Sequence, residues 1–235
     1  PVEDVYNFII NDLTEAERLL PATIPANKGK ISVGAVKTLL GKVYLTRHEY
    51  DKAASKLKEV IDMNAYSLVD DYGSLFSEGN DDMPESIFEI EFASGNIGEG
   101  NNFAHHFYPN VVNMAVFPSL QLGGGRCVPG ASLMDAYEEN DLRKDQSVGD
   151  RLPMLDGTFS DYTFGRKFVD YSASKTDDSG VNFTLLRYAD VLLMYAESLN
   201  EVGQTNLAYE YINKVRTRAG LTALSGLSQD DFRLV

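Results

Sequence analysis

Apolar residues recur at helical spacing in three segments of the first 66 residues. The first run stops before Pro21, which predicts a helix up to that point. A second helix is expected from Ser32, whose hydroxyl suits an N-cap, to about Tyr44. A third is expected over about residues 50–63. Because a tight turn joins the second and third helices, they should pack as an antiparallel hairpin.

The small and apolar positions of this hairpin return near the other end of the chain, in Thr184–Leu221. The matched positions are Gly41 and Ala196, Tyr44 and Leu199, Ala53 and Ala208, Leu57 and Ile212, and Val60 and Val215. Small residues at the first and third positions let two helices approach closely, and the larger ones fill the seam. This pattern is typical of a tetratricopeptide-type helix pair. The last pair is expected over about residues 184–201 and 204–218, with Gly220 in the left-handed conformation that ends a helix.

Between the two helix pairs, Ser86–Phe92 alternates strictly between apolar and acidic residues and predicts a half-buried strand. Phe88 and Ile90 are expected to face the core. Glu89 and Glu91 are expected to face the solvent.

The rest of this stretch is rich in Gly, Asn and aromatic residues and has no helical period. Residues 131–139 predict a short helix, and residues 152–183, with the turn pair Asp156-Gly157, predict one or two small β-hairpins. We therefore predict a mainly α fold, in which tetratricopeptide-like helix pairs are interrupted by a long irregular insertion. The expected organisation is a single domain in three parts: helical residues 1–66, a loop-rich, ligand-binding insertion over residues 67–183, and helical residues 184–235.

Composition narrows the function classes. The chain carries 21 basic and 35 acidic residues, a formal charge of −14, which repels phosphate backbones and argues against nucleic acid as a partner. No run approaches the roughly 18 apolar residues that would span a bilayer. Pro1 and Val235 are interpreted as cut points of a longer protein, so that any leader would lie upstream.

Three segments in order resemble the SusD/RagB-like outer-membrane nutrient-binding lipoproteins. They are residues 34–69 followed by SIFEIEF, residues 128–148 (VPGASLMDAYEENDLRKDQSV), and residues 185–221 (LLRYADVLLMYAESLNEVGQTNLAYEYINKVRTRAGL). The resemblance implies a protein of Bacteroidetes-type bacteria, lipid-anchored on the outer face of the outer membrane. It implies binding of starch, another polysaccharide or an oligosaccharide without catalysis and without a cofactor. The glycan would pass to a TonB-dependent, SusC-like transporter.

The family's lipidated N-terminal Cys and first helices have no counterpart in this sequence, and neither does its C-terminal portion. We therefore expect a fragment lacking both ends, whose membrane attachment is only through an anchor outside the chain.

A glycan site combines flat apolar faces with side chains that hydrogen-bond hydroxyls, and the insertion supplies both. The wider set of candidates is Asn101, Asn102, Phe103, Phe107, Tyr108, Asn110, Asn113, Gln121, Arg126, Tyr162, Phe164 and Tyr171. The residues expected to contact ligand are Asn102, Phe107, Tyr108, Asn113, Arg126 and Tyr162. Contact residues vary within the family, so these are predictions for a region. The alternative is that most of these aromatics form a core under long loops.

Other patterns have a structural interpretation that is favoured over a chemical one. Glu89 and Glu91 could form a glycosidase acid–base pair, but their alternation already explains them as the wet side of a sheet. Adjacent histidines at 105 and 106 do not predict a metal site, since neighbouring side chains rarely converge on one ion. Gly123–Gly125 is expected to be a flexible loop beside Arg126 rather than a phosphate cradle.

Arg187 and Asp190 lie three residues apart in a predicted helix and are expected to pair in a structural network. A second function remains open for the helices themselves. They could form a tetratricopeptide-like protein–protein interaction module, with a peptide in the helical groove and the insertion as decoration.

Overall fold

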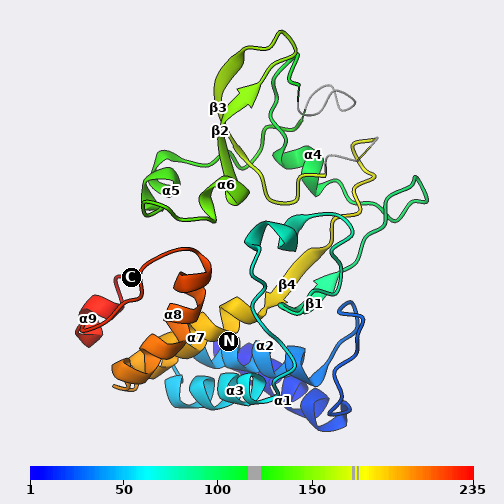
Figure 1. Ribbon diagram of the computed structural model, residues 1–235. Coiled ribbons are helices and arrows are strands. Elements are labelled where there is room, and N and C mark those ends of the chain that lie inside the picture. Colours follow the sequence, from blue (N-terminus) through cyan, green and yellow to red (C-terminus); the bar gives the residue numbers. More distant parts are fainter. Residues whose placement is uncertain (116–122, 171–172, 174) are drawn as a thin grey trace. The chain divides into compact units, whose positions relative to one another are not determined.

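The computed structural model describes residues 1–115, 123–170, 173 and 175–235. The chain forms two compact units (Figure 1). The helical unit comprises residues 1–70, 82–89 and 184–235, and the loop-rich unit comprises residues 71–81 and 90–183. That the whole chain is one domain with an insertion over residues 67–183 stays a prediction.

Two antiparallel helix pairs, α2–α3 and α7–α8, form the body of the helical unit, and α3 packs against α7 (Figure 1). Its elements are α1 (Val2–Leu19), α2 (Val33–Thr46), α3 (Tyr50–Asp62), β1 (Ser86–Ile90), β4 (Phe183–Arg187), α7 (Tyr188–Glu201), α8 (Thr205–Arg218) and α9 (Gln229–Phe232). The mainly α fold with tetratricopeptide-like helix pairs is confirmed.

The helix ends follow the local signals in the sequence. The Ser32 hydroxyl caps α2 by accepting a hydrogen bond from the Ala35 amide at 3.1 Å. Gly220 follows α8 with φ of +77°, the left-handed conformation that glycine adopts without a steric penalty. The expectation of a helix from residue 184 is wrong, because Thr184 to Arg187 belong to β4, which pairs with β1. A short apolar run fits a strand as well as a helix, and the strand partner decided between them.

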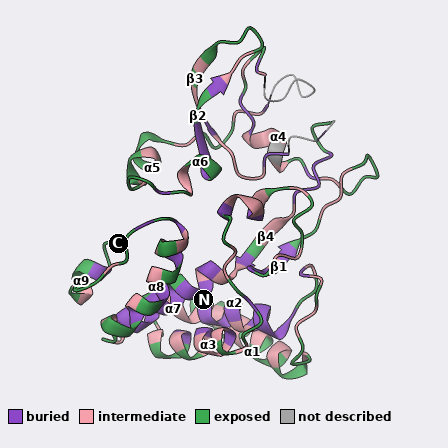
Figure 2. Cartoon of the chain, in the orientation of Figure 1, coloured by how far each residue is buried: buried purple, intermediate pink, exposed green. Residues whose placement is uncertain are grey.

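The matched small residues line the helix seams, which are buried in Figure 2. A Cβ atom built on Gly41 would lie 2.7 Å from both Cγ and Cδ2 of Leu57, so the α2–α3 seam has no room for a side chain there. Ala53, Ala196 and Ala208 are buried as well. The close helix approach expected from the repeat is therefore present.

The first helix, α1, contains no fully buried residue, and an ion network contributes to its attachment. Glu17 accepts from the Nζ atoms of Lys37 and Lys56, each at 2.9 Å, and both lysines also contact Glu59. Burial alone would raise the pKa of Glu17, but the hydrogen bonds from the two lysines outweigh it and lower that pKa below its ordinary value. This network joins α1 to α2 and α3.

Strand β1 agrees with the prediction only in part, since Phe88 packs against the core as expected but Ile90 and Glu89 have exchanged their expected environments. Ile87 and Glu89 are buried, whereas Ile90 is 43% exposed. Glu89 is held inside because it accepts hydrogen bonds from the Ser86 hydroxyl at 3.0 Å and from the Asp82 amide at 2.8 Å. Local donors thus satisfied a carboxylate that alternation alone assigned to solvent.

The loop-rich unit is built around one hairpin and several short helices. Its elements are the 3₁₀ helix η1 (Tyr72–Phe76), α4 (Phe103–Phe107), α5 (Ala131–Ala136), α6 (Lys144–Ser147), β2 (Val148–Pro153) and β3 (Phe159–Gly165). Its described core comprises Tyr108, Met114, Leu152, Phe164, Val169 and Ala173.

Antiparallel pairing of β2 and β3 confirms the predicted hairpin, which turns at Asp156 and Gly157. The Asp156 carboxylate accepts from the Thr158 amide at 2.9 Å, and Gly157 takes a φ of +83°. In the described part of residues 152–183, the turn at residues 177–180 contributes an isolated bridge, Ser179 with Asn101, rather than another hairpin.

Candidate functional site

The candidate ligand-binding residues lie in the loop-rich unit, where the glycine run at 123–125 is held against the end of α4. The amides of Gly124, Gly125 and Arg126 donate to the carbonyl oxygens of residues 105, 108 and 106 at 2.8–2.9 Å. A Cβ atom on Gly123 would lie 2.3 Å from the Cβ and the carbonyl oxygen of Tyr108. The glycines therefore permit a close backbone approach, and the expectation of a flexible loop is wrong for these residues.

This pairing gathers several of the predicted residues. A Cβ atom on Gly125 would lie 3.0 Å from Cβ of Asn110 and 3.4 Å from the hydroxyl oxygen of Tyr162. Arg126 and Asn110 are exposed, and Phe107 and Tyr162 are partly exposed. We call these four residues, Phe107, Asn110, Arg126 and Tyr162, the Arg126 cluster. The backbone contacts bring together the segments that carry these four residues, whose side chains are two aromatic rings, an amide and a guanidinium.

Two other predicted residues lie on the same chain segments. Asn102 is exposed and starts the α4 turn, where its carbonyl oxygen accepts from the His106 amide at 3.1 Å. Asn113 is exposed with φ of +63°, and its carbonyl oxygen accepts from Leu155 at the tip of the β2–β3 hairpin at 2.9 Å. Asn113 therefore lies beside the hairpin tip. Whether any of these residues contacts a ligand stays a prediction.

Tyr108 has a different environment from the one expected. Its side chain is 0% exposed, its hydroxyl donates to the carbonyl oxygen of Asp170 at 2.7 Å, and the Asp170 amide donates back at 2.9 Å. A side chain with no exposed surface offers a ligand no face, so in this structure Tyr108 packs the core. Asn101 is also buried, with its amide group bonded to the carbonyls of Ser179 and Val181. The candidates Gln121 and Tyr171 lie outside the described residues.

The two adjacent histidines, His105 and His106, belong to α4 and are partly exposed. Burial, followed by electrostatic interaction with His106 and Arg126, lowers the pKa of His105 below its ordinary value. Across the described residues, no group of three or more His, Cys, Asp or Glu side chains is placed to hold a metal ion. In the turn at residues 177–180, the Asp178 carboxylate has a local structural role, since it accepts a hydrogen bond from the Asn96 amide at 2.8 Å.

Sequence reasoning missed a buried ion cluster in the helical unit. The fully buried Glu85 pairs with Arg187 through one carboxylate oxygen and with Arg218, at 2.8 Å, through the other. The same oxygen that accepts from Arg218 accepts from the Val69 amide at 2.9 Å. The predicted pair of Arg187 and Asp190 is wrong, and Asp190 pairs instead with Lys42 at 3.2 Å. No local spacing could reveal this cluster, because its members are far apart in the sequence.

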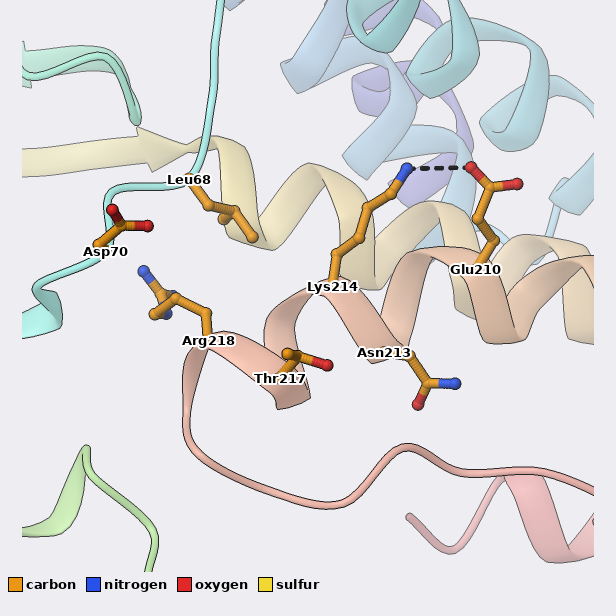
Figure 3. A pocket seen from close by; sticks show the side chains of 7 residues that line it. All are labelled: Leu68, Asp70, Glu210, Asn213, Lys214, Thr217 and Arg218. Carbon is orange, nitrogen blue, oxygen red and sulfur yellow. Dashed lines mark hydrogen bonds and ion pairs between the residues drawn. The ribbon is translucent and has the colours of Figure 1, made fainter.

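An open hollow of about 690 Å³ lies along α8 in the helical unit (Figure 3). It is lined by Leu68, Asp70, Glu210, Asn213, Lys214, Thr217 and Arg218. Lys214 pairs with Glu210 at 3.0 Å, and Asn213 bonds both backbone groups of Leu224. Much of its polar wall is thus engaged with the protein itself, in contrast to the Arg126 cluster.

None of the helices in the described ranges has both the length and the apolar character that crossing a membrane requires.

Comparison with known proteins finds relatives with the same architecture. Residues 155–233 match the SusD family. SusD-like protein P2 of Formosa agariphila is 27% identical over 99% of this chain and 52% of its own length. The solved structure of a SusD superfamily protein from Parabacteroides distasonis is similar with a TM-score of 0.82 and 28% identity, over 99% of this chain and 54% of that one. The resemblance to the SusD family is confirmed.

A further solved structure is similar over most of the chain. The solved structure of a laminarin-binding SusD-like protein is similar with a TM-score of 0.79 and 29% identity, over 94% of this chain and 55% of that one. The chain spans about half the length of the curated SusD-like relatives it matches. The Arg126 cluster of the loop-rich unit is the candidate site.

Proposed function

We propose that this chain is the glycan-binding part of a SusD-like lipoprotein on the surface of a Bacteroidetes-type bacterium. The observation that carries the proposal is the likeness, over 94% of the chain, to a SusD-like protein that binds laminarin. In this proposal the protein is anchored by lipid to the outer face of the outer membrane. It binds an oligosaccharide or polysaccharide without turnover and delivers it to a TonB-dependent, SusC-like transporter.

The geometry of the Arg126 cluster supports binding of sugars. Partly exposed rings at Phe107 and Tyr162 can stack on the C–H faces of a sugar, while Asn110 and Arg126 can bond its hydroxyls. Asn102 and Asn113 extend the proposed polar surface. Tyr108 is left out of the proposed site because it is buried.

The environment of Glu89 supports binding without hydrolysis. A glycosidase needs one carboxylic acid and one carboxylate facing each other across a cleft. Glu89 is instead buried with its carboxylate bonded to Ser86 and to the Asp82 amide, while Glu91 is exposed. The pair therefore has a structural role in this proposal.

The test is calorimetric titration of the chain with a glycan panel that includes laminarin and starch, followed by chromatography of the recovered sugars. We expect affinities on the order of micromolar to millimolar and no shortened products. Arg126→Ala should weaken binding roughly 10-fold, the loss of one charge-assisted hydrogen bond. Arg18→Ala, at an exposed position in α1, is the matched control and should bind like the wild type. Hydrolysis of any glycan would exclude the non-catalytic function, and failure to bind any glycan would exclude the glycan function.

One observation favours the second candidate, a tetratricopeptide-like interaction module. An apolar hollow of about 440 Å³ in the helical unit is lined by Leu13, Ala16, Ile31, Ala35, Val36, Leu39, Lys42, Phe88, Leu185 and Leu186. Such a hollow fits the apolar face of a peptide helix. Leu185→Asp would abolish peptide capture there and leave glycan binding intact, whereas Arg126→Ala would do the reverse.

A further inference from the structure

The β2–β3 hairpin has one face in the core and one face in solvent. Its inner face carries Leu152 and Phe164, which are both buried. On the outer face, the cross-strand pairs are Pro153 with Phe159 and Arg151 with Asp161. Phe159 is 58% exposed, whereas Leu152 and Phe164 on the inner face are buried. The sequence therefore places an aromatic ring on the side of the hairpin where burial does not require one.

Arg151 lies over this ring, with its guanidinium carbon 4.6 Å from the ring centroid of Phe159. Arg151 and Asp161 are both exposed. Within the ranges that the structure describes, neither the guanidinium nor the Asp161 carboxylate has a hydrogen bond or ion pair with another protein group. Both can therefore bond a ligand without first breaking a hydrogen bond or an ion pair within the described protein; the contact of Arg151 in these ranges is with the Phe159 ring.

The spacing of these groups suits one sugar ring. Phe159 and Asp161 are two residues apart on the same face, about 7 Å along the strand at the usual rise per residue. A pyranose whose C–H face covers the open part of the Phe159 ring would bring its hydroxyls within reach of the Asp161 carboxylate and the Arg151 guanidinium. The carboxylate accepts and the guanidinium donates, and a hydroxyl can do both.

We propose that the outer face of the β2–β3 hairpin, with Phe159 as the stacking platform and Arg151 and Asp161 at its edge, is a sugar-contact surface of this protein. This inference rests on the proposed glycan-binding function and adds to it residues outside the Arg126 cluster. The occupant is one ring of the bound glycan. The hairpin contributes an apolar face and two charged groups to it, and no bond is made or broken.

The chain contains no Trp, so Phe159→Trp introduces a single reporter at this surface. Titrating that variant with a glycan that the wild type binds should change the intensity and the emission maximum of the new indole. Phe159→Ala should weaken binding at least about fivefold, because truncation removes the stacking face. Phe159→Tyr keeps that face and should bind within about twofold of the wild type.

Phe8 provides the matched controls, because it is also an exposed Phe and lies on α1 in the helical unit. Phe8→Trp should give no sugar-dependent emission change, and Phe8→Ala should bind like the wild type. If the wild type binds a glycan, Phe159→Ala binds it with the same affinity and the emission of Phe159→Trp does not change, the proposed hairpin surface is wrong and the proposed function stands. A wild type that binds no glycan would overturn the proposed function, and this inference with it. Circular dichroism of each variant establishes that the fold is intact before its affinity is compared.

Discussion

Removing the Glu85 carboxylate should destabilise the helical unit more than removing its partly exposed partner Arg187. The Glu85 side chain is 0% exposed, and it pairs with Arg218, which is 5% exposed, and with Arg187, which is 26% exposed. Glu85→Ala would leave the Arg218 charge buried without its carboxylate and would also remove the acceptor of the Val69 amide. Breaking a buried pair in this way costs about 3–5 kcal/mol, a large part of the total stability of an ordinary domain.

Loss of the Arg187 side chain should cost less stability than loss of the Glu85 carboxylate. In Arg187→Ala the carboxylate keeps Arg218 and the Val69 amide as partners, and the side chain that is lost was already in partial contact with water. We expect about 1–2 kcal/mol for this variant, in the range of a lost hydrogen bond to a charged group. The double variant Glu85→Met, Arg218→Met replaces both buried charges with apolar groups, which is often close to neutral. It should therefore recover most of the stability lost in Glu85→Ala.

Urea unfolding at pH 7 measures these differences, with circular dichroism at 222 nm reporting the helices and tyrosine fluorescence serving as a second probe. Coincident transitions would justify a two-state free energy. If Glu85→Ala and Arg187→Ala lost the same stability within about 0.5 kcal/mol, or if the double Met variant were no more stable than Glu85→Ala, burial of the Arg218 charge would not be the controlling factor.

Two further predictions concern the helix packing. Gly41→Val should destabilise the chain by about 2 kcal/mol, because even a Cβ atom would lie 2.7 Å from Leu57. In a double-mutant cycle measured by urea unfolding, Leu57→Ala should reduce the destabilisation caused by Gly41→Val. Purely additive effects of the two substitutions would contradict a tight seam. The ion network of Glu17 with Lys37 and Lys56 should lose its contribution to stability in acid. Although burial opposes it, the two lysines lower the pKa of Glu17 in the folded state below its ordinary value of 4.5. The stabilisation is therefore present above pH 4.5 and is lost as the pH falls through the lower pKa of the folded state. The urea concentration at the unfolding midpoint of the wild type should decrease as the pH is lowered below 4.5, and Glu17→Gln should reduce that decrease. An unchanged pH dependence in the variant would show that Glu17 does not attach α1.

The candidate site was predictable as a region and less so residue by residue. Composition directed attention to the stretch that holds Phe107, Arg126 and Tyr162. The backbone pairing of residues 123–126 with residues 105–109, and the approach of Tyr162 to Gly125, bring the segments that carry them together. The same composition could not distinguish Tyr108 from Phe107, although one is in the core and the other is partly exposed. Neighbours in sequence differ in burial because distant segments cover them, and Asp170 covers Tyr108.

By itself the sequence determined the helices, their caps and their seams, since these depend on residues within a few positions of each other. Ser32 bonds an amide three residues away, Gly220 needs only its own backbone freedom, and Gly41 marks a seam that its own repeat predicts. Tertiary structure decided which face of β1 points inward and which charges meet. Alternation specifies that a strand has two different faces, but the buried one depends on what lies across from it, and for Glu89 this was the Asp82 amide. The partners of Glu85 lie 102 and 133 residues away, and only the folded chain brings them together.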